Sequence, residues 1–274
     1  MEILAIGCFH GKVPKNLKKF CDKNDIDAIL CLGDYAEGTE IRRWEFKNWD
    51  EIGYRIEIGQ TFDKIVSETV GTEKFAQWED LAQRRGDAVL NILKKIKIPI
   101  AYIHGNHDNV ERVKKFAGND FVHNKIFKLE GLEIAAYGNF RGASAKRNQH
   151  KESKAHMSQQ ISKRIKGMNE KFRTDLLRLG KRKPDIFILH DPPYNTKCDL
   201  TGKGSPEPNS HVGDEIARQI IVKYRPKLVL CCHIHEAHGV DSIGSTTVVN
   251  VGQGGHGHAA IISLPSLHYK LVKI

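Results

Sequence analysis

Five short apolar runs, each closed by a small polar cluster, constrain the fold of this chain more than any other feature. The runs are residues 3–6, 28–32, 98–103, 186–189 and 228–232. The clusters at their ends are Cys8-Phe9-His10, Gly33-Asp34, Gly105-Asn106-His107-Asp108, His190-Asp191 and Cys232-His233-Ile234-His235. Short apolar runs bounded by Gly and polar residues are typical of buried strands. Side chains at the carboxyl ends of several such strands can converge, so we expect one shared site.

The segments between these runs predict an α/β protein. Helical spacing of apolar residues predicts helices at 14–24, 73–97, 153–180 and 217–224, and further strands are expected within 121–140 and at 246–251, 259–264 and 268–273. Residues 41–59 carry no pattern that assigns them to a helix or a strand. Strands alternate with helices in the first part of the chain, and the last part is rich in strands. Together these patterns predict two packed sheets with helices outside.

The bulk properties favour one soluble globular domain. The chain has 274 residues, of which 40% are hydrophobic and 28% charged. We expect a single domain over residues 1–274, with a helical insertion at about 41–97 and a basic helical segment at about 141–183. No apolar stretch approaches the roughly 20 residues that cross a bilayer, and no signal peptide is evident, so no membrane partner is expected. Six irregularly spaced cysteines favour free thiols and a cytoplasmic location.

The residue types in the five clusters are those that a pair of divalent cations requires. Asp34 follows a strand and a glycine, from where its carboxylate could bridge two ions. One ion could be completed by His10 and His235 together with Cys8, and the other by Asn106, His190 and His233. His233 and His235 are separated by one residue, a spacing that lets both rings project from one side of the strand end.

His107 and Asp108 have a separate predicted role. His107 lies beside the ligand Asn106 without needing to be a ligand itself, which suits a general acid that protonates a leaving oxygen. Asp108 could orient it. Taken singly, each cluster has a simpler interpretation: a lone histidine after a strand is usually a hydrogen-bonded surface residue, and Gly-Asp is usually a turn. Their common position at five strand ends favours the metal interpretation.

With these motifs the sequence resembles the calcineurin-like metallophosphoesterase superfamily, whose pattern runs Asp-x-His, Gly-Asp, Gly-Asn-His-Asp/Glu, a lone His, then Gly-His-x-His. The match extends from Cys8 to His235, and the blocks at 190–194, 232–236 and 250–252 look most like the Icc-related phosphoesterases. The resemblance implies a four-layer α-β-β-α sandwich of two mixed sheets. It also implies a dinuclear centre, with Mn as the first choice and Fe, Zn or Ni as alternatives.

The activity that the resemblance implies is hydrolysis of a phosphate ester by a metal-bridging hydroxide. Asn106 and His107 would contact the phosphoryl oxygens and the leaving group. We expect a phosphodiester as the substrate in preference to a phosphomonoester, because an open site needs no pocket for a dianion.

This chain departs from the family pattern at two positions. Cys232 stands where the pattern has Gly, which raises the question of whether that turn is altered. Cys8 stands where the pattern has a metal-binding Asp. A thiolate keeps the negative charge and would tilt the site toward softer metals such as Zn or Fe and away from Mg. The competing interpretation is that Cys8 is a small buried residue that leaves one site weak or empty.

The net charge of +10 is concentrated in residues 141–183, where 14 Lys and Arg face three acids. This segment could bind nucleic acid, and a catalytically idle scaffold that binds RNA or a protein partner through it is the alternative function. We favour a solvated helix face, because Phe172 is the segment's single aromatic residue. The loop at 191–213, with Tyr194, Lys197, Asp199 and His211, is a candidate substrate lid. The sequence does not indicate an oligomeric state.

Overall fold

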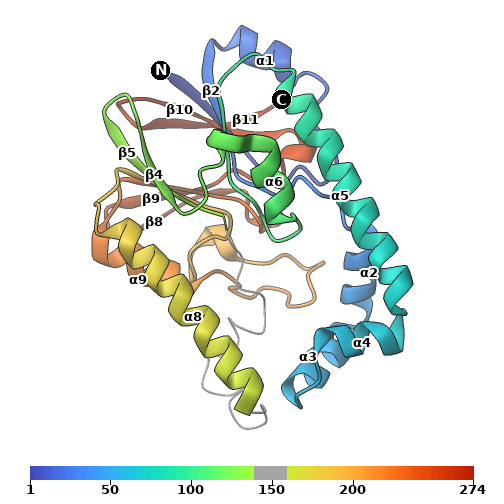
Figure 1. Ribbon diagram of the computed structural model, residues 1–274. Coiled ribbons are helices and arrows are strands. Elements are labelled where there is room, and N and C mark those ends of the chain that lie inside the picture. Colours follow the sequence, from blue (N-terminus) through green and yellow to red (C-terminus); the bar gives the residue numbers. More distant parts are fainter. Residues whose placement is uncertain (139–158) are drawn as a thin grey trace.

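The computed structural model describes residues 1–138 and 159–274, and its centre is a pair of sheets (Figure 1). The first sheet has the strand order β11-β10-β1-β2-β3. Its strands are β1 (Glu2–Ile6), β2 (Ile26–Cys31), β3 (Ile100–Tyr102), β10 (His258–Ser263) and β11 (His268–Lys273). β1, β2 and β3 are parallel to one another, while β10 is antiparallel to both of its neighbours. The carboxyl ends of the three parallel strands therefore lie at the same edge.

The second sheet has the order β4-β5-β6-β7-β9-β8 and is also mixed. Its strands are β4 (Lys125–Leu129), β5 (Leu132–Tyr137), β6 (Ile186–Leu189), β7 (Leu228–Cys231), β8 (Gly239–Ile243) and β9 (Thr246–Asn250). β5, β6, β7 and β9 are parallel, and the antiparallel β4 and β8 form the two edges. The sequence patterns did not predict β8, whose mostly half-buried residues carry no apolar run.

Three buried apolar clusters show that these elements stack in four layers. One cluster lies between the sheets and joins residues such as Leu30 of the first sheet and Leu230 of the second. Another packs α1 (Leu17–Lys23), α5 (Thr72–Lys94) and α6 (Val110–Ala117) on the outer face of the first sheet. The last packs α8 (Gln159–Gly180) and α9 (Glu215–Tyr224) on the outer face of the second. The predicted four-layer α-β-β-α sandwich is confirmed.

Residues 39–69 form a helical arm at one end of α5 (Figure 1). The arm consists of α2 (Thr39–Lys47), α3 (Trp49–Glu57) and α4 (Phe62–Thr69). The sequence left most of this region unassigned, because three short amphipathic helices with few buried residues give a weak periodic signal. α5 itself is continuous through Gly86, where a Cβ atom would lie 3.0 Å from the backbone of Ala36. The glycine thus lets the helix approach the segment that follows β2.

The basic segment predicted at 141–183 is described only in part, since residues 141–158 lie outside the described residues. α8 packs through Phe172, Leu176 and Leu179, all buried in the cluster over the second sheet. Met168, which lies at helical spacing from Phe172, is 42% exposed and so does not belong to the packed face. Four of the described basic side chains have local partners, as in the ion pair between Arg182 and Glu133. These contacts favour the solvated-face interpretation for the described half, and nucleic-acid binding stays an unfavoured prediction.

The state of the cysteines and the character of the helices bear on the predicted cellular setting. All six cysteines are free and buried. Within the described residues, no helix has both the length and the apolar character needed to cross a membrane. The cytoplasmic location and the division of residues 1–274 into one domain with two inserted segments remain predictions.

Candidate metal centre

Five strand ends from both sheets bring the predicted site residues together. Cys8 and His10 follow β1, Asp34 follows β2, Asn106 and His107 follow β3, His190 follows β6, and His233 and His235 follow β7. Within the described residues, the side chains form four overlapping groups of three whose ligand atoms lie within 4.8 Å of one another. The groups are Cys8–His10–His235, His10–Asp34–His107, Asp34–His190–His233 and Cys8–His190–Cys232. The predicted convergence is therefore present.

One half of the centre contains Cys8, His10 and His235. The Nε2 atoms of His10 and His235 face each other at 3.1 Å, and the two rings meet edge to face. The Nδ1 atom of His10 is buried and has no hydrogen-bond partner within the described residues. Burial lowers the pKa of His10 to about 3, although the Asp34 carboxylate opposes this shift. A neutral imidazole is the form that binds a metal ion.

The other half contains His190 and His233, with Asn106 beside them. His190 is fully buried, and its Nδ1 lies 2.8 Å from the carbonyl oxygen of Leu32. Its Nε2 lies 3.0 Å from Oδ1 of Asn106. Burial lowers the pKa of His190, but the Asp34 carboxylate, together with the bond to the Leu32 carbonyl and the nearby Cys8, raises it overall to about 10. In the metal-free protein, His190 therefore carries a proton that a metal ion would have to displace.

Asp34 lies between the two halves. Its Oδ2 is 3.7 Å from Nε2 of His10 and 3.3 Å from Nε2 of His190, and the residue is 1% exposed. Its Oδ1 accepts a hydrogen bond from the backbone N–H of His107. Burial raises the pKa of this carboxyl, but His190 and His107 outweigh burial and hold it well below its usual range. Asp34 is thus a buried carboxylate that faces imidazoles on two sides.

The backbone at the centre is held in an uncommon conformation. Four of the candidate ligands have positive φ angles: Cys8 (53°), His10 (45°), Asp34 (56°) and His233 (62°). Such angles are rare for residues other than Gly, Asn and Asp, and each costs on the order of 1 kcal/mol or more. They persist because surrounding contacts fix them, such as the bond from the His10 N–H to the Asp34 carbonyl. These φ angles turn the side chains away from the direction of the preceding strands and toward one another.

Gly105 marks the closest approach of two strand ends. A Cβ atom at this position would overlap Oδ1 of Asp34 and would lie 2.6 Å from Cε1 of His190. The glycine in Gly-Asn-His-Asp is therefore required by the space between a carboxylate of the first sheet and an imidazole of the second. No side chain fits there without moving both.

Asp108 binds the backbone of the neighbouring turns. Its two oxygens accept hydrogen bonds from the N–H groups of Gly105, Asp34, Tyr35 and Ala36. These four bonds join the loop after β3 to the turn after β2. The role of Asp108 in orienting the His107 ring, like the assignment of His107 as a general acid, stays a prediction.

Gln83 of α5 is a residue that sequence reasoning missed. Its Nε2 donates to the carbonyl oxygen of His107 at 2.8 Å, and its Oε1 accepts from the N–H of Asn109 at 2.9 Å. The amide thus spans the loop that carries His107. A glutamine on the polar face of an amphipathic helix gives no signal in the sequence that could have identified it. Asn250, the last residue of β9, supports the centre similarly by donating to the carbonyl oxygen of Ile234.

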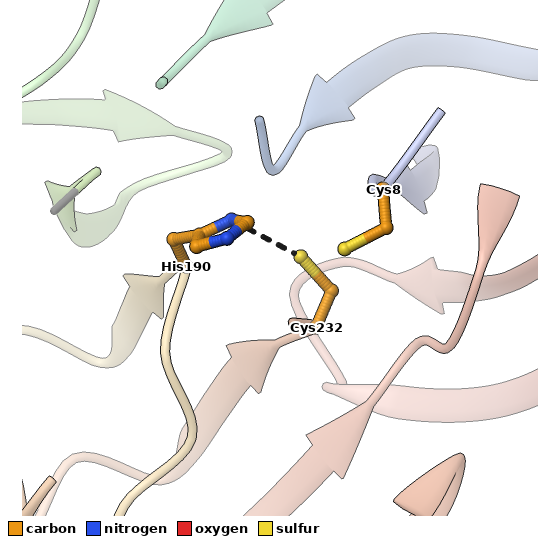
Figure 2. A group of neighbouring side chains, drawn as sticks. All are labelled: Cys8, His190 and Cys232. Carbon is orange, nitrogen blue, oxygen red and sulfur yellow. Dashed lines mark hydrogen bonds between the residues drawn. The ribbon is translucent and has the colours of Figure 1, made fainter. Parts of the chain in front are cut away.

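The two residues that depart from the family pattern lie side by side (Figure 2). The sulfur atoms of Cys8 and Cys232 lie within 4.8 Å of each other, and both residues are fully buried. Sγ of Cys8 also accepts a bond from the backbone N–H of His233 at 3.1 Å. Sγ of Cys232 lies 3.5 Å from Nδ1 of His190. Burial, and after it the neighbouring Cys232 thiol, raise the pKa of the Cys8 thiol well above its usual value.

The centre opens into a cavity of about 1100 Å³. His10, Asp34, Asn106, His107, His233 and His235 form part of its wall. The predicted lid loop contributes Tyr194 and His211 to the wall. Asp199 instead holds this loop from inside: it is fully buried and accepts bonds from the N–H groups of Asn195, Thr196 and Gly213 and from the His211 ring.

The donor set fits divalent cations. Imidazole nitrogens, a shared carboxylate and an amide oxygen are ligands for Mn, Fe, Zn or Ni, and a thiolate suits Zn and Fe in particular. The facing Nε2 atoms of His10 and His235 are the expected feature of rings arranged around an ion. Asp34, with imidazoles on both sides, can serve two ions at once.

Comparisons with known proteins agree with this geometry. Residues 1–237 match the family model described as calcineurin-like phosphoesterase. The chain is 24% identical to the uncharacterized protein MJ1162 of Methanocaldococcus jannaschii, over 91% of this chain and 87% of that protein. Among solved structures, it is similar to TT1561 of Thermus thermophilus (TM-score 0.56, 18% identity, 99% and 98% of the two chains). It is also similar to a dimetal phosphatase from Danio rerio (TM-score 0.53, 10% identity, 100% and 98%). At these identities, the two structures show the shared fold alone.

Proposed function

The chain belongs to the calcineurin-like phosphoesterase family, and from this premise we propose that it hydrolyses a phosphodiester at a centre of two divalent cations. Membership of the family makes it a metal-dependent hydrolase of phosphate esters. The number and identity of the metals and the diester preference are the proposed part.

The observation that carries the proposal is the position of Asp34 between two sets of ligands. Cys8, His10 and His235 would hold one cation, and His190, His233 and Asn106 the other. Asp34 would bridge them, since its Oδ2 faces His10 on one side and His190 on the other. When bound, the two cations supply an activated water and neutralise the charge of the phosphoryl oxygens.

The residues of the loop after β3 would act on the substrate. His107 lines the cavity and is half-buried, with its backbone tied to Asp34 and Gln83, so its ring is held beside the centre. We propose that it protonates the leaving oxygen. Asn106 is exposed to the cavity and can contact a phosphoryl oxygen as well as a cation.

Cys8 is proposed as a ligand of the first cation. Its Sγ is one of the three ligand atoms in its half of the centre. Burial keeps the thiol protonated without a metal, so binding would release its proton. Manganese remains the first choice from the family resemblance, whereas the thiolate favours Zn or Fe in the half that contains Cys8.

The charge of the cavity supports a diester. Histidines aside, the cationic side chains among its described lining are Arg42 and Lys203, and Arg42 is already paired with Glu37 at 3.3 Å. A monoester dianion would need more positive charge than a diester monoanion. The wall therefore suits a substrate with a single negative charge.

Metal analysis of the purified protein, combined with hydrolysis of bis-p-nitrophenyl phosphate in Mn, Ni, Zn and Fe, tests the proposal. We expect about two ions per chain and turnover with at least one metal. Asp34→Asn should lose both. Fewer than one bound ion per chain, together with no turnover in any metal, would overturn it.

A further inference from the structure

The cavity at the metal centre continues beneath the helical arm, residues 39–69. Ile41, Phe46, Trp49 and Phe62 of the arm line it, together with Phe75 of α5. Its volume of about 1100 Å³ far exceeds what a phosphate group occupies. Pockets for small organic ligands measure about 300–1,000 Å³ and are mostly apolar. The cavity thus has room for an organic group next to the centre.

Phe46 is the most exposed of these apolar side chains. Its side chain is 48% exposed, and its ring meets that of Trp49 edge to face at 6.3 Å. An exposed Phe is not informative by itself. Here the exposed ring belongs to the wall of the cavity that contains the metal centre, so its open face is accessible to a bound molecule.

The aromatic residues behind it make this wall rigid. Phe62, Phe75 and Trp44 contact one another edge to face, at centroid distances of 5.7–5.9 Å. They join α2 and α4 of the arm to α5. The apolar wall is therefore braced against the main body of the protein and can present a preformed surface.

Charge is distributed unequally along the cavity. The cations of the proposed metal centre would hold an anionic group at that end, whereas Arg42 in the wall is already ion-paired with Glu37. Under the arm, the wall combines the apolar side chains with Glu45 and Glu79, which disfavour a second anionic group there. A ligand that matches both parts has an anionic end at the centre and an apolar end under the arm.

We propose that the arm binds an aromatic or similarly flat apolar ester group, so that the preferred substrates are phosphodiesters with one bulky aromatic group. The substrate class rests on the proposed function, since it assigns the organic group of the ester cleaved at the same centre. Phe46 is then a specificity-determining residue.

Binding of two phosphonates tests the inference without turnover. Phenylphosphonate and methylphosphonate are titrated by calorimetry into the metal-loaded protein. We expect phenylphosphonate to bind about fivefold more tightly, since an aromatic contact of this kind contributes on the order of 1 kcal/mol. Phe46→Ala should reduce the ratio to about twofold or less, and Phe46→Tyr, which keeps the ring, should preserve it.

Tyr54→Ala is the matched control, because Tyr54 is a 63% exposed aromatic residue on α3 that does not line the cavity. The ratio of the phenylphosphonate affinity to the methylphosphonate affinity in Tyr54→Ala should equal that of the wild type. Equal affinities for the two phosphonates, or a ratio that Phe46→Ala leaves unchanged, would overturn the inference.

Turnover separates the two proposals. Methyl p-nitrophenyl phosphate has one aromatic group, and we expect Phe46→Ala to lower its kcat/KM about fivefold while Phe46→Tyr preserves it. Turnover of this ester with a kcat/KM that Phe46→Ala leaves unchanged refutes the inference and leaves the proposed function intact. A phenyl preference in binding that depends on Phe46, with no turnover of the ester, supports the binding surface and refutes the hydrolytic function.

Discussion

Cys8 and Cys232, which follow strands of different sheets, place their thiols side by side in the metal centre, within 4.8 Å of each other and of a ring nitrogen of His190 (Figure 2). They are also the two positions at which this chain departs from the pattern of its family. The side chain at 232 occupies space next to Gly7, where a Cβ atom would lie 3.0 Å from the Cys232 sulfur. The two residues that differ from the family pattern are therefore neighbours in space, and both side chains lie at the metal centre.

Replacing the thiol by the carboxylate of the family pattern should change the preferred metal. In Cys8→Asp we expect the ratio of bound Zn to bound Mn to fall roughly tenfold, because a hard oxygen replaces a soft sulfur. Metal content after growth in equal concentrations of the two metals gives the ratio. The cobalt-loaded wild type should show a sulfur-to-metal charge-transfer band that the variant lacks. If the Zn-to-Mn ratio is unchanged in Cys8→Asp and the cobalt-loaded wild type shows no such band, Cys8 is a buried residue that does not bind the metal.

The Cys8→Asp variant should be more stable with a glycine at position 232 than with the native cysteine. The sulfur atoms of Cys8 and Cys232 lie within 4.8 Å of each other, so a carboxylate at position 8 would crowd the Cys232 side chain, and Cys232→Gly should relieve part of the destabilisation caused by Cys8→Asp. In a double-mutant cycle of urea unfolding, we expect a coupling free energy of about 1 kcal/mol. Strictly additive effects would contradict the coupling. Cys21→Gly, which removes a buried thiol on α1 far from the centre, is the matched control.

Gly105→Ala should abolish metal binding while leaving most of the fold intact. The added methyl group would overlap the Asp34 carboxylate and crowd His190, so both must move. We expect less than about a tenth of the wild-type metal content, since ligand displacements of this size disrupt coordination geometry. Circular dichroism should stay close to that of the wild type. Gly204→Ala, in an open loop position with no atom within 4 Å, should bind metal normally.

Gln83→Ala should reduce kcat with little change in metal content. The variant loses two hydrogen bonds to the loop after β3. This loop carries His107, whereas most of the proposed metal ligands belong to other strand ends. A drop of about tenfold in kcat is expected, since small misplacements of catalytic groups have large effects. Gln77→Ala, at an exposed position of the same helix, should behave as the wild type. Loss of bound metal in Gln83→Ala would indicate a wider structural role.

His123 should make the metal-free protein sensitive to acid. Burial and the nearby His104 lower its pKa from 6.5 to about 4, so between these values the unfolded state binds more protons than the folded one. Stability contributed by the neutral ring is present above pH 6.5 and is lost as the pH falls toward 4, by about 2–3 kcal/mol. In His123→Gln, whose amide can still accept the bond from Gly138, this loss should be absent. Urea unfolding of both proteins with chelator at pH 7 and pH 4 gives the difference, and parallel losses would contradict it.

The parts of the fold that sequence reasoning predicted are those with a strong local signal. The strand at 186–189 was predicted with its observed bounds, because four consecutive apolar residues are flanked by Asp185 and His190. The helix over 73–97 was found to within three residues, since its apolar positions recur at helical spacing. The helical insertion at about 41–97 was predicted, but α2, α3 and α4 within it were not delimited, because their sequences carry few buried residues.

The sequence by itself determined the ligand types, their order and their position after strands, because these depend on short-range patterns of apolar and polar residues. Only the tertiary structure decided that Asp34 lies between His10 and His190, that Gln83 holds the His107 loop, and that Cys8 touches Cys232. These contacts join residues that are 24 to more than 200 positions apart. Which strand ends meet depends on how two sheets pack and on how closely glycines such as Gly105 let them approach, and no local pattern carries that information.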